Sequence, residues 1–409
     1  MLTRFQLRLL AILALINFVN FADRLVVPPL FPLLREHFNL TSAQLGWLQT
    51  VLQIVLALAT IPFGLLADRF SRPRIIAYGV VFWSLATFLT GMANRFAVLL
   101  MARALVGVGE AAYAPAAQSM ISGAFPAESR ARVQAVFAAG MLTGATTGLA
   151  LGGVLAETFG WRLVFFFIGV PGLLLALSAL HLEEPPRGPR SEVVPLTRIL
   201  SVPAYLAMIF SGAFVTFTSV AFITWGPDFV VRWKDFSPRE AGVWLGTTVL
   251  GGSLLGVLTG GYVADWAQKR YQYGRILTVA LAFLAAAPIL VWGLYAEERN
   301  SLIAALFIAV FLMSWYHGPV TAVIHDLMPR RAHATSVGVY VFLTQLIGGV
   351  LGPLVVGKID DLATLLLGLE VAVGVMVAGA LCMFLVVRFI RRDGLHHPRL
   401  DAFRVEASD

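Results

Sequence analysis

Long apolar segments separated by short polar stretches dominate this chain. A membrane-spanning helix needs about 20 mostly apolar residues, and twelve segments of the sequence meet that requirement. They begin near Leu7, Ala43, Ile75, Ala97, Val133, Trp161, Tyr205, Gly242, Ile276, Ser301, Ala334 and Thr364. The pattern therefore predicts an all-α integral membrane protein with twelve transmembrane helices.

The longest polar connector leaves six of these segments on each side. It contains Glu183-Glu184-Pro185-Pro186-Arg187-Gly188-Pro189-Arg190, a composition typical of a Pro-rich linker. We therefore expect four parts: an N-terminal six-helix bundle over 1–180, a cytoplasmic linker over 181–203, a C-terminal six-helix bundle over 204–390 and a cytoplasmic tail over 391–409.

A short motif occurs twice, about half the chain length apart. Gly64-Leu65-Leu66-Ala67-Asp68-Arg69 returns as Gly261-Tyr262-Val263-Ala264-Asp265-Trp266. Each copy closes a long apolar segment. Repeats at equivalent ends of membrane-length segments indicate two halves of parallel topology, as in many secondary transporters.

Composition and charge agree with a membrane location. Hydrophobic residues make up 58% of the chain and charged residues only 13%, which is too few for the polar surface of a soluble protein. The net charge of +7 comes from basic residues scattered through short loops, so we expect no nucleic-acid partner. Most of the 30 Lys and Arg residues lie in the termini and the even-numbered loops. The positive-inside rule then predicts a multi-pass protein of the cell membrane with both termini in the cytoplasm.

Four ionisable residues interrupt the apolar segments: Asp23, Arg24, Arg103 and Glu110. Charged groups inside membrane spans are costly and usually functional. Arg103 and Glu110 lie two helical turns apart and share a face, whereas Asp23 and Arg24 point about 100° apart. At least one of the latter two needs a partner elsewhere, and we expect the fourth segment to supply it.

These four charges sum to zero, which suggests a coupling mechanism. A proton on Glu110 or Asp23 would remove the counter-ion of one arginine, whose planar guanidinium suits an anionic group of a substrate. We predict Glu110 as the principal proton carrier and Asp23 as the second, with Arg24 and Arg103 binding substrate. The alternative is a permanently paired cluster that only orders the first and fourth helices.

The stretch from Gly64 to Arg74, Gly-Leu-Leu-Ala-Asp-Arg-Phe-Ser-Arg-Pro-Arg, closely resembles the signature of the major facilitator superfamily between its second and third helices. The resemblance implies two pseudo-symmetric six-helix bundles and alternating access. It also implies gating roles for Gly64, which would let helices approach closely, for the charged residues Asp68, Arg69 and Arg72, and for Asp265 in the second copy. The alternative for these charges is an ordinary basic cytoplasmic loop.

Two further segments resemble the Spinster branch of that superfamily. Asn17, Asn20, Asp23 and Arg24 match a pattern shared with the anion:cation symporters, and the segment from Arg103 to Tyr113, Arg-Ala-Leu-Val-Gly-Val-Gly-Glu-Ala-Ala-Tyr, is similar to that of Spinster proteins. Departures occur at Val26-Val27-Pro28-Pro29 and at Asp228. The resemblance implies an amphipathic anionic lipid, such as a lysophospholipid or a sphingosine-phosphate-like molecule, as cargo.

The second half is nearly uncharged within its seventh, eighth, tenth and eleventh segments but rich in aromatic residues. They are Phe214, Phe217, Phe222, Trp225, Phe311, Trp315, Tyr316 and Phe342. An aromatic wall facing the charged first half would suit an amphipathic cargo, so we predict Asn20, Tyr113, Trp225, Tyr316 and His317 as further substrate contacts. Alternatively, these aromatics face lipid or pack between helices, and His317 is a buried, hydrogen-bonded imidazole.

Glycines recur every four residues in the fifth segment, at Gly140, Gly144, Gly148 and Gly152. Small residues at this spacing allow helices to pack closely.

Other classes of protein lack their usual signatures in this sequence. We find no nucleophile with an adjacent base, no metal-ligand cluster and no phosphate-binding loop with a lysine, so we expect neither an enzyme nor a cofactor. The predicted partners are a small-molecule substrate, protons and membrane lipids, and the predicted state is a monomer. The second candidate function is a proton-coupled carrier of small organic anions such as sugar acids, or a drug-type exporter.

Overall fold

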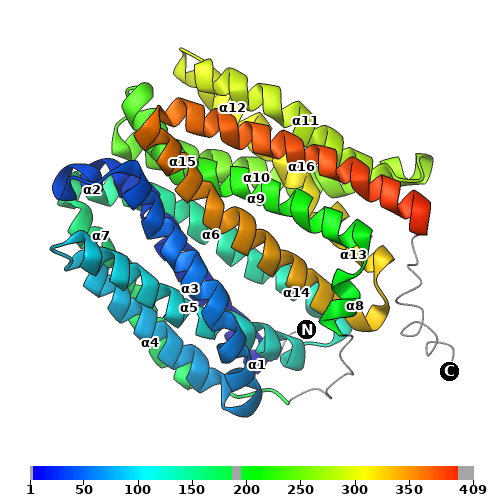
Figure 1. Ribbon diagram of the computed structural model, residues 1–409. Helices are drawn as coiled ribbons and strands as arrows, with labels where there is room; N and C mark the ends of the chain where they lie inside the picture. The colour runs from blue at the N-terminus through cyan, green and yellow to red at the C-terminus, as the bar shows by residue number, and fades with distance from the viewer. Residues whose placement is uncertain (1–2, 187–194, 395–409) are drawn as a thin grey trace. The chain divides into compact units, whose positions relative to one another are not determined.

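The computed structural model describes residues 3–186 and 195–394, and the regular elements in these ranges are all helical. Figure 1 shows them as a set of long helices joined by short turns. In chain order they are α1 (Arg4–Leu25), η1 (Pro28–Leu30), α2 (Phe31–Phe38), α3 (Ser42–Arg69), α4 (Arg72–Gly91), α5 (Phe96–Ala124), α6 (Ala127–Phe159), α7 (Trp161–Leu180), α8 (Leu196–Leu200), α9 (Pro203–Trp233), α10 (Pro238–Arg270), α11 (Gly274–Tyr295), α12 (Arg299–Met313), η2 (Ser314–Tyr316), α13 (His317–Leu327), η3 (Arg330–Ala332), α14 (His333–Thr344), the π-helical turn η4 (Gln345–Gly349), α15 (Val350–Leu362) and α16 (Leu365–Asp393).

Twelve segments within the described residues are long and apolar enough to cross a membrane, which confirms the predicted number. Three of them consist of several elements in series: α1, η1 and α2; α12, η2 and α13; and α14, η4 and α15. In the first, Pro28 and Pro29 stand in the short η1 turn. Proline has no backbone N–H and cannot continue the hydrogen-bond ladder of an α-helix, so the departure Val26-Val27-Pro28-Pro29 changes the geometry of the first span without ending it.

Local sequence signals explain several helix ends. Thr3 and Thr41 each form a capping box, with Gln6 and Gln44 respectively, at the starts of α1 and α3. Such reciprocal bonds satisfy backbone N–H groups that have no partner inside the helix. Asn39 ends α2 in the left-handed conformation, with φ of 51°.

Contacts between helices divide the chain into two compact units. The first unit comprises 1–189 together with 223–247 and 353–362, and the second comprises 190–222, 248–352 and 363–409. The division predicted from the sequence, into bundles over 1–180 and 204–390, follows chain order and stays a prediction. Most of the predicted cytoplasmic tail, from residue 395 on, lies outside the described residues.

In the first unit, α6 lies directly against α1. A Cβ atom at Gly140, Gly144 or Gly148 would overlap the carbonyl oxygen of Ala14, Phe18 or Ala22 in turn. The glycine spacing of four therefore matches the repeat of α1 turn by turn, as expected for close packing of small residues. This contact, with the packing of α5 against α3 and α4, holds the helices that carry the intramembrane charges.

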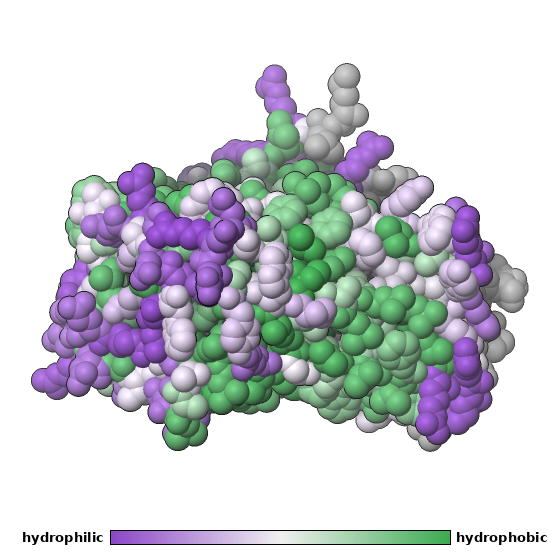
Figure 2. Space-filling model, turned by 90° about the horizontal axis from the view of Figure 1, so that it is seen from above, coloured by the Kyte–Doolittle hydropathy of each residue, from purple (hydrophilic) through white to green (hydrophobic). Residues whose placement is uncertain are grey.

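In the second unit, α11 packs against α12 and α16, around an apolar core that includes Phe283, Leu290 and Met376. Large hydrophobic side chains are also exposed on both units, among them Leu58 and Leu281. Figure 2 shows this as broad green areas between groups of hydrophilic residues. Apolar surface of this extent is typical of a protein whose solvent is the lipid hydrocarbon.

Candidate functional site

Two ion pairs join α1 to α5 in the first unit. Arg24 Nε lies 2.7 Å from Glu110 Oε2, and Arg103 Nη1 lies 2.9 Å from Asp23 Oδ1. The fourth span thus supplies partners for both neighbouring residues of the first span, as the 100° divergence of Asp23 and Arg24 indicated. We call these four residues the charge cluster.

The Asp23–Arg103 pair is buried and extended to a third helix. The hydroxyl of Thr87, on α4, donates to Asp23 Oδ2. The side chain of Asp23 is 1% exposed and that of Arg103 is fully buried. The pair and the Thr87 hydroxyl thus link α1, α4 and α5. Removing one partner from such a pair would leave an uncompensated buried charge.

The Arg24–Glu110 pair differs because one of its members is accessible. The Arg24 side chain is 16% exposed while that of Glu110 is fully buried, and the Arg24 guanidinium lies 4.8 Å from the centre of the Phe21 ring. Arg24 is therefore the cation of the charge cluster with surface available to a ligand.

Several buried polar atoms around these pairs have no hydrogen-bond partner within the described part of the chain. They are Glu110 Oε1, Asn20 Nδ2, and Nε and Nη2 of Arg103. A buried polar atom without a partner costs about 1–3 kcal/mol. The surroundings of the charge cluster thus hold hydrogen-bonding capacity that other described protein groups do not use.

Two predicted substrate contacts are packed into the first unit instead of lining an open surface. The Tyr113 hydroxyl donates to the carbonyl of Leu13 at 2.5 Å. Trp225 is fully buried, and its indole N–H donates to the carbonyl of Pro353 at 2.9 Å. The structure therefore does not bring the Trp225 ring to an accessible position.

Tyr316 and His317 lie in the second unit, where η2 meets α13. Their rings are 4.1 Å apart, and His317 is exposed while Tyr316 is half-buried. No hydrogen bond of the His317 ring to another described residue is found, so the structure does not place this imidazole in a hydrogen-bonded pair within the described part of the chain.

The charged residues of the first copy of the repeated motif differ in their burial. Arg72 is buried, donates to the Ser119 carbonyl at 3.3 Å and lies 3.4 Å from the carboxylate of Glu184, whereas Asp68 and Arg69 are exposed at the end of α3. At Gly64 an added Cβ would meet nothing within 4 Å. The close helix approach that the resemblance implies at this glycine is therefore not found.

The second copy of the motif contains an ion-pair network, and the sequence predicted only one of its residues. Arg275, at the start of α11, lies 2.8 Å from Asp265 and 3.2 Å from Asp326. Asp265 was predicted, but Arg275 and Asp326 were not, since single charges at span ends look like ordinary loop charges.

The sequence pattern did not predict a larger polar network, which lies at the far end of the first span. Arg35 on α2 lies 2.8 Å from Asp228 on α9, and Arg232, one turn further along α9, lies 3.2 Å from Asp228 and 2.6 Å from Asp360 on α15. Ser42, which begins α3, accepts from Arg35 at 2.7 Å and donates to Asp360 at 2.5 Å. We call these five residues the end cluster, and all of them belong to the first unit.

Asp361 adds a second link between α15 and α3. Its carboxylate accepts from the backbone N–H groups of Ser42 and Ala43, at 2.7 and 2.9 Å. A carboxylate at a helix N-terminus satisfies unpaired donors and interacts favourably with the helix dipole. The departure from the Spinster pattern at Asp228 was the one sequence signal that pointed to this region.

Residues 13–353 match the Major Facilitator Superfamily. The chain belongs to that superfamily. It is 29% identical over 379 residues to protein spinster homolog 1 of Xenopus laevis, covering 86% of this chain and 72% of the relative. It is 27% identical over 406 residues to an MFS-type efflux pump of Mycolicibacterium smegmatis, covering 95% and 94%. A bacterial homologue of the human lysosomal transporter Spinster, solved in an inward-facing and unoccupied conformation, superposes with a TM-score of 0.85 at 24% identity, covering 95% of this chain and 98% of that one.

The chain is thus a Spinster-like member of a superfamily of membrane transporters, with the twelve-span fold of that superfamily.

Proposed function

We propose that this protein is a secondary active transporter that works by alternating access, takes up a proton at Glu110 and moves an amphipathic anionic lipid. The observation that carries the proposal is the Arg24–Glu110 ion pair. It joins an accessible cation to a buried carboxylate at 2.7 Å, inside a membrane span where ionisable groups are usually functional.

A proton on Glu110 would remove the charge that holds Arg24. The guanidinium would then be a cation without its counter-ion, with exposed surface and a geometry suited to a phosphate or carboxylate. Loss of the proton would restore the pair and favour release of the anion. Substrate binding and protonation would therefore be coupled through one contact.

The Asp23–Arg103 pair has a different place in this scheme. Asp23 is held by both Arg103 and Thr87, and neither charge of the pair has accessible side-chain surface. We propose that it orders α1, α4 and α5 throughout the cycle, so Arg24 binds the anion and Arg103 keeps Asp23 in place. The prediction of Asp23 as a second proton carrier is not needed for this scheme.

An anionic lipid as cargo is what the resemblance of the sequence to Spinster proteins implies, and the aromatic character of the second half of the chain agrees with it. Tyr316 and His317 remain the predicted contacts of that half. We also propose that both termini are cytoplasmic and that the protein lies in the cell membrane, because basic residues concentrate on the side of the termini.

The end cluster supports alternating access. With cytoplasmic termini, the far end of the first span is the outer side, so the contacts among α2, α3, α9 and α15 would close that side. Opening it requires the contacts that join the two predicted bundles, Arg35–Asp228 and Ser42–Asp360, to separate. Arg72–Glu184 and Asp265–Arg275–Asp326 are the corresponding cytoplasmic contacts within each unit.

A drug-type exporter is the second candidate function. It is favoured by the mycobacterial relative, which is described as an MFS-type efflux pump and aligns with nearly the whole chain. A carrier of small organic anions such as sugar acids shares the Asn and Asp-Arg pattern of the first span and is tested in the same experiment.

The test is uptake of a labelled lysophospholipid into proteoliposomes under an imposed pH gradient. We expect gradient-dependent uptake that is inhibited by unlabelled lysophospholipid and not by a sugar acid or a cationic drug. If only the cationic drug or only the sugar acid inhibits this uptake, the result would favour the drug exporter or the organic-anion carrier, respectively. Absence of uptake by correctly inserted protein would reject the lipid assignment.

A further inference from the structure

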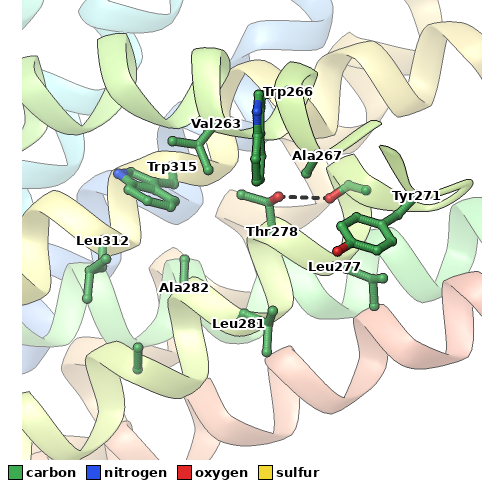
Figure 3. Close-up of a pocket in the computed structure, with 12 residues that line it drawn as sticks. Val263, Trp266, Ala267, Tyr271, Leu277, Thr278, Leu281, Ala282, Leu312 and Trp315 are labelled. Carbon is green, nitrogen blue, oxygen red and sulfur yellow. Dashed lines mark hydrogen bonds between the residues drawn. The ribbon is translucent and has the colours of Figure 1, made fainter. Parts of the chain in front are cut away.

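A groove of about 500 Å³ opens on the second unit where α10, α11, α12 and η2 meet. In Figure 3, Trp266 extends from α10 to Thr278 of α11, between Trp315 on one side and Tyr271 on the other. Apart from the polar atoms of these rings, the lining side chains offer a single hydroxyl, that of Thr278, and it donates to the Gly274 carbonyl at 2.8 Å. The walls are thus apolar, and the volume lies within the ~300–1,000 Å³ of ordinary ligand pockets.

Beyond one end of the groove, α10 packs closely against α12 and η2. A Cβ at Gly260 would lie 2.5 Å from Trp315 Cα, and a Cβ at Gly256 would overlap the carbonyl oxygen of Phe311. Along this stretch, the backbone of α10 is therefore in direct contact with the segment formed by α12 and η2. The groove begins one turn later on α10, at Val263.

The aromatic and aliphatic groups of the groove are open to their surroundings. Trp266 is 46% exposed, and Tyr271 and Leu281 are each 59% exposed. In a protein with twelve membrane spans such surface is in contact with hydrocarbon. Along α11 the lining extends from Gly274 to Ala285, about 17 Å at the rise of an α-helix, so an extended chain entering at the helix ends would follow it inward.

One end of the groove has a cationic rim. Lys269 and Arg270 end α10 immediately before Tyr271, and the Arg270 guanidinium lies 4.4 Å from the centre of the Trp266 ring. Neither forms an ion pair with a carboxylate among the described residues, unlike Arg275 nearby. A cation stacked on an aromatic ring at a membrane boundary is well placed for a lipid phosphate.

We propose that this groove is a specific site for an anionic phospholipid, with one acyl chain between Trp266, Trp315 and Leu281 and the phosphate head group at Lys269 and Arg270. The site belongs to the second unit alone and does not depend on which substrate the transporter moves. Its head group would lie beside the turn between α10 and α11, which carries Asp265 and Arg275, so occupancy would stabilise the second copy of the gating motif.

The test is native mass spectrometry of the purified full-length protein, titrated with phosphatidylglycerol and with phosphatidylcholine of the same acyl chains. We expect one phosphatidylglycerol to bind at least tenfold more tightly than phosphatidylcholine. The double variant Lys269→Gln/Arg270→Gln should weaken phosphatidylglycerol binding about 30-fold, since each cation near the membrane surface contributes about 1 kcal/mol, and should leave phosphatidylcholine binding unchanged. Ala285→Trp, at an exposed position of the groove, should weaken both lipids.

Two matched variants separate this site from general lipid contact. Arg8→Gln removes an exposed cation from α1, and Leu381→Trp adds an indole at an exposed position of α16; neither should change lipid binding. Equal binding of the two phospholipids, or equal effects of Leu381→Trp and Ala285→Trp, would overturn the proposal. Displacement of phosphatidylglycerol by a lysophospholipid that also depends on Lys269 and Arg270 would overturn it in favour of a substrate entry site.

Discussion

Asp23 and Arg24 are neighbours in sequence but have different surroundings in the structure. Because successive residues of a helix diverge by about 100°, one side chain turns to Arg103 and Thr87 and the other to Glu110. The first pair is sealed by protein, and the second has an exposed member. This difference is the basis for assigning structural order to one pair and transport chemistry to the other.

The buried pair should be a determinant of stability. Asp23→Asn leaves the Arg103 guanidinium buried without its counter-ion, which typically costs about 3–5 kcal/mol. We expect a clearly lower melting temperature of the detergent-solubilised protein, and a smaller decrease for the double variant Asp23→Asn/Arg103→Gln. A melting temperature unchanged by Asp23→Asn would contradict the role given to this pair.

At the scale of elements, the packing of α6 on α1 is the contact that positions the charge cluster. The carbonyl oxygens of α1 face glycines at every fourth position of α6, so a side chain there would push the helices apart. Asp23 and Arg24 lie directly after Ala22, which packs on Gly148. Displacing α6 would therefore disturb both ion pairs.

Alanine at two glycines should have opposite effects. Gly144→Ala introduces a Cβ that overlaps the backbone of Phe18, and we expect loss of folded protein in a fluorescence size-exclusion assay. Gly64→Ala meets no atom within 4 Å and should keep or slightly raise stability, by about 0.5–1 kcal/mol from the preference of a helix for alanine over glycine. A tolerated Gly144→Ala beside a destabilising Gly64→Ala would refute this account of the two glycines.

Much of the fold, and the two helices that form the charge cluster, were predictable from the sequence. A membrane span is recognised from the hydropathy averaged over about 20 residues, so the twelve helices could be predicted without knowledge of any contact. Charged residues inside such a span are exceptions that the sequence shows directly. The partners Arg103 and Glu110 were expected because their spacing puts them on one face. The end cluster was not expected, because Arg35 meets Asp228 across 193 positions and Ser42 meets Asp360 across 318. At the ends of spans Arg and Asp are common, so neither residue type nor local spacing identifies such pairs.

At the scale of the whole molecule, ion pairs stand at both ends of the spans and in the middle. The end cluster joins helices from the first and second halves of the chain within the first unit. The family cycle requires the outer side to open, and water can replace each of these ion pairs and hydrogen bonds. The free energy of the cluster would thus contribute to the balance between the two states of the transporter.

Weakening the end cluster should expose residues behind it. Thr224 lies one turn before Asp228 on α9 and is fully buried. In a Cys382→Ala background, we expect Thr224→Cys to react slowly with a membrane-impermeant maleimide added from outside. Adding Arg35→Gln and Arg232→Gln leaves Asp228 and Asp360 without an arginine partner and should raise the rate about tenfold or more. Glu36→Gln, an exposed neutralisation on the same helix as Arg35, is the control, and an equal increase with it would rule out the proposed closure.

The central claim, that Glu110 couples a proton to substrate binding, is tested most directly by comparing two transport modes of Glu110→Gln in proteoliposomes. The variant imitates the protonated carboxyl, so we expect it to exchange labelled for unlabelled lysophospholipid at a rate close to that of the unaltered protein, while accumulation driven by a pH gradient is lost. Glu36→Gln should retain both modes. Gradient-driven accumulation that persists at full level in Glu110→Gln would contradict the account.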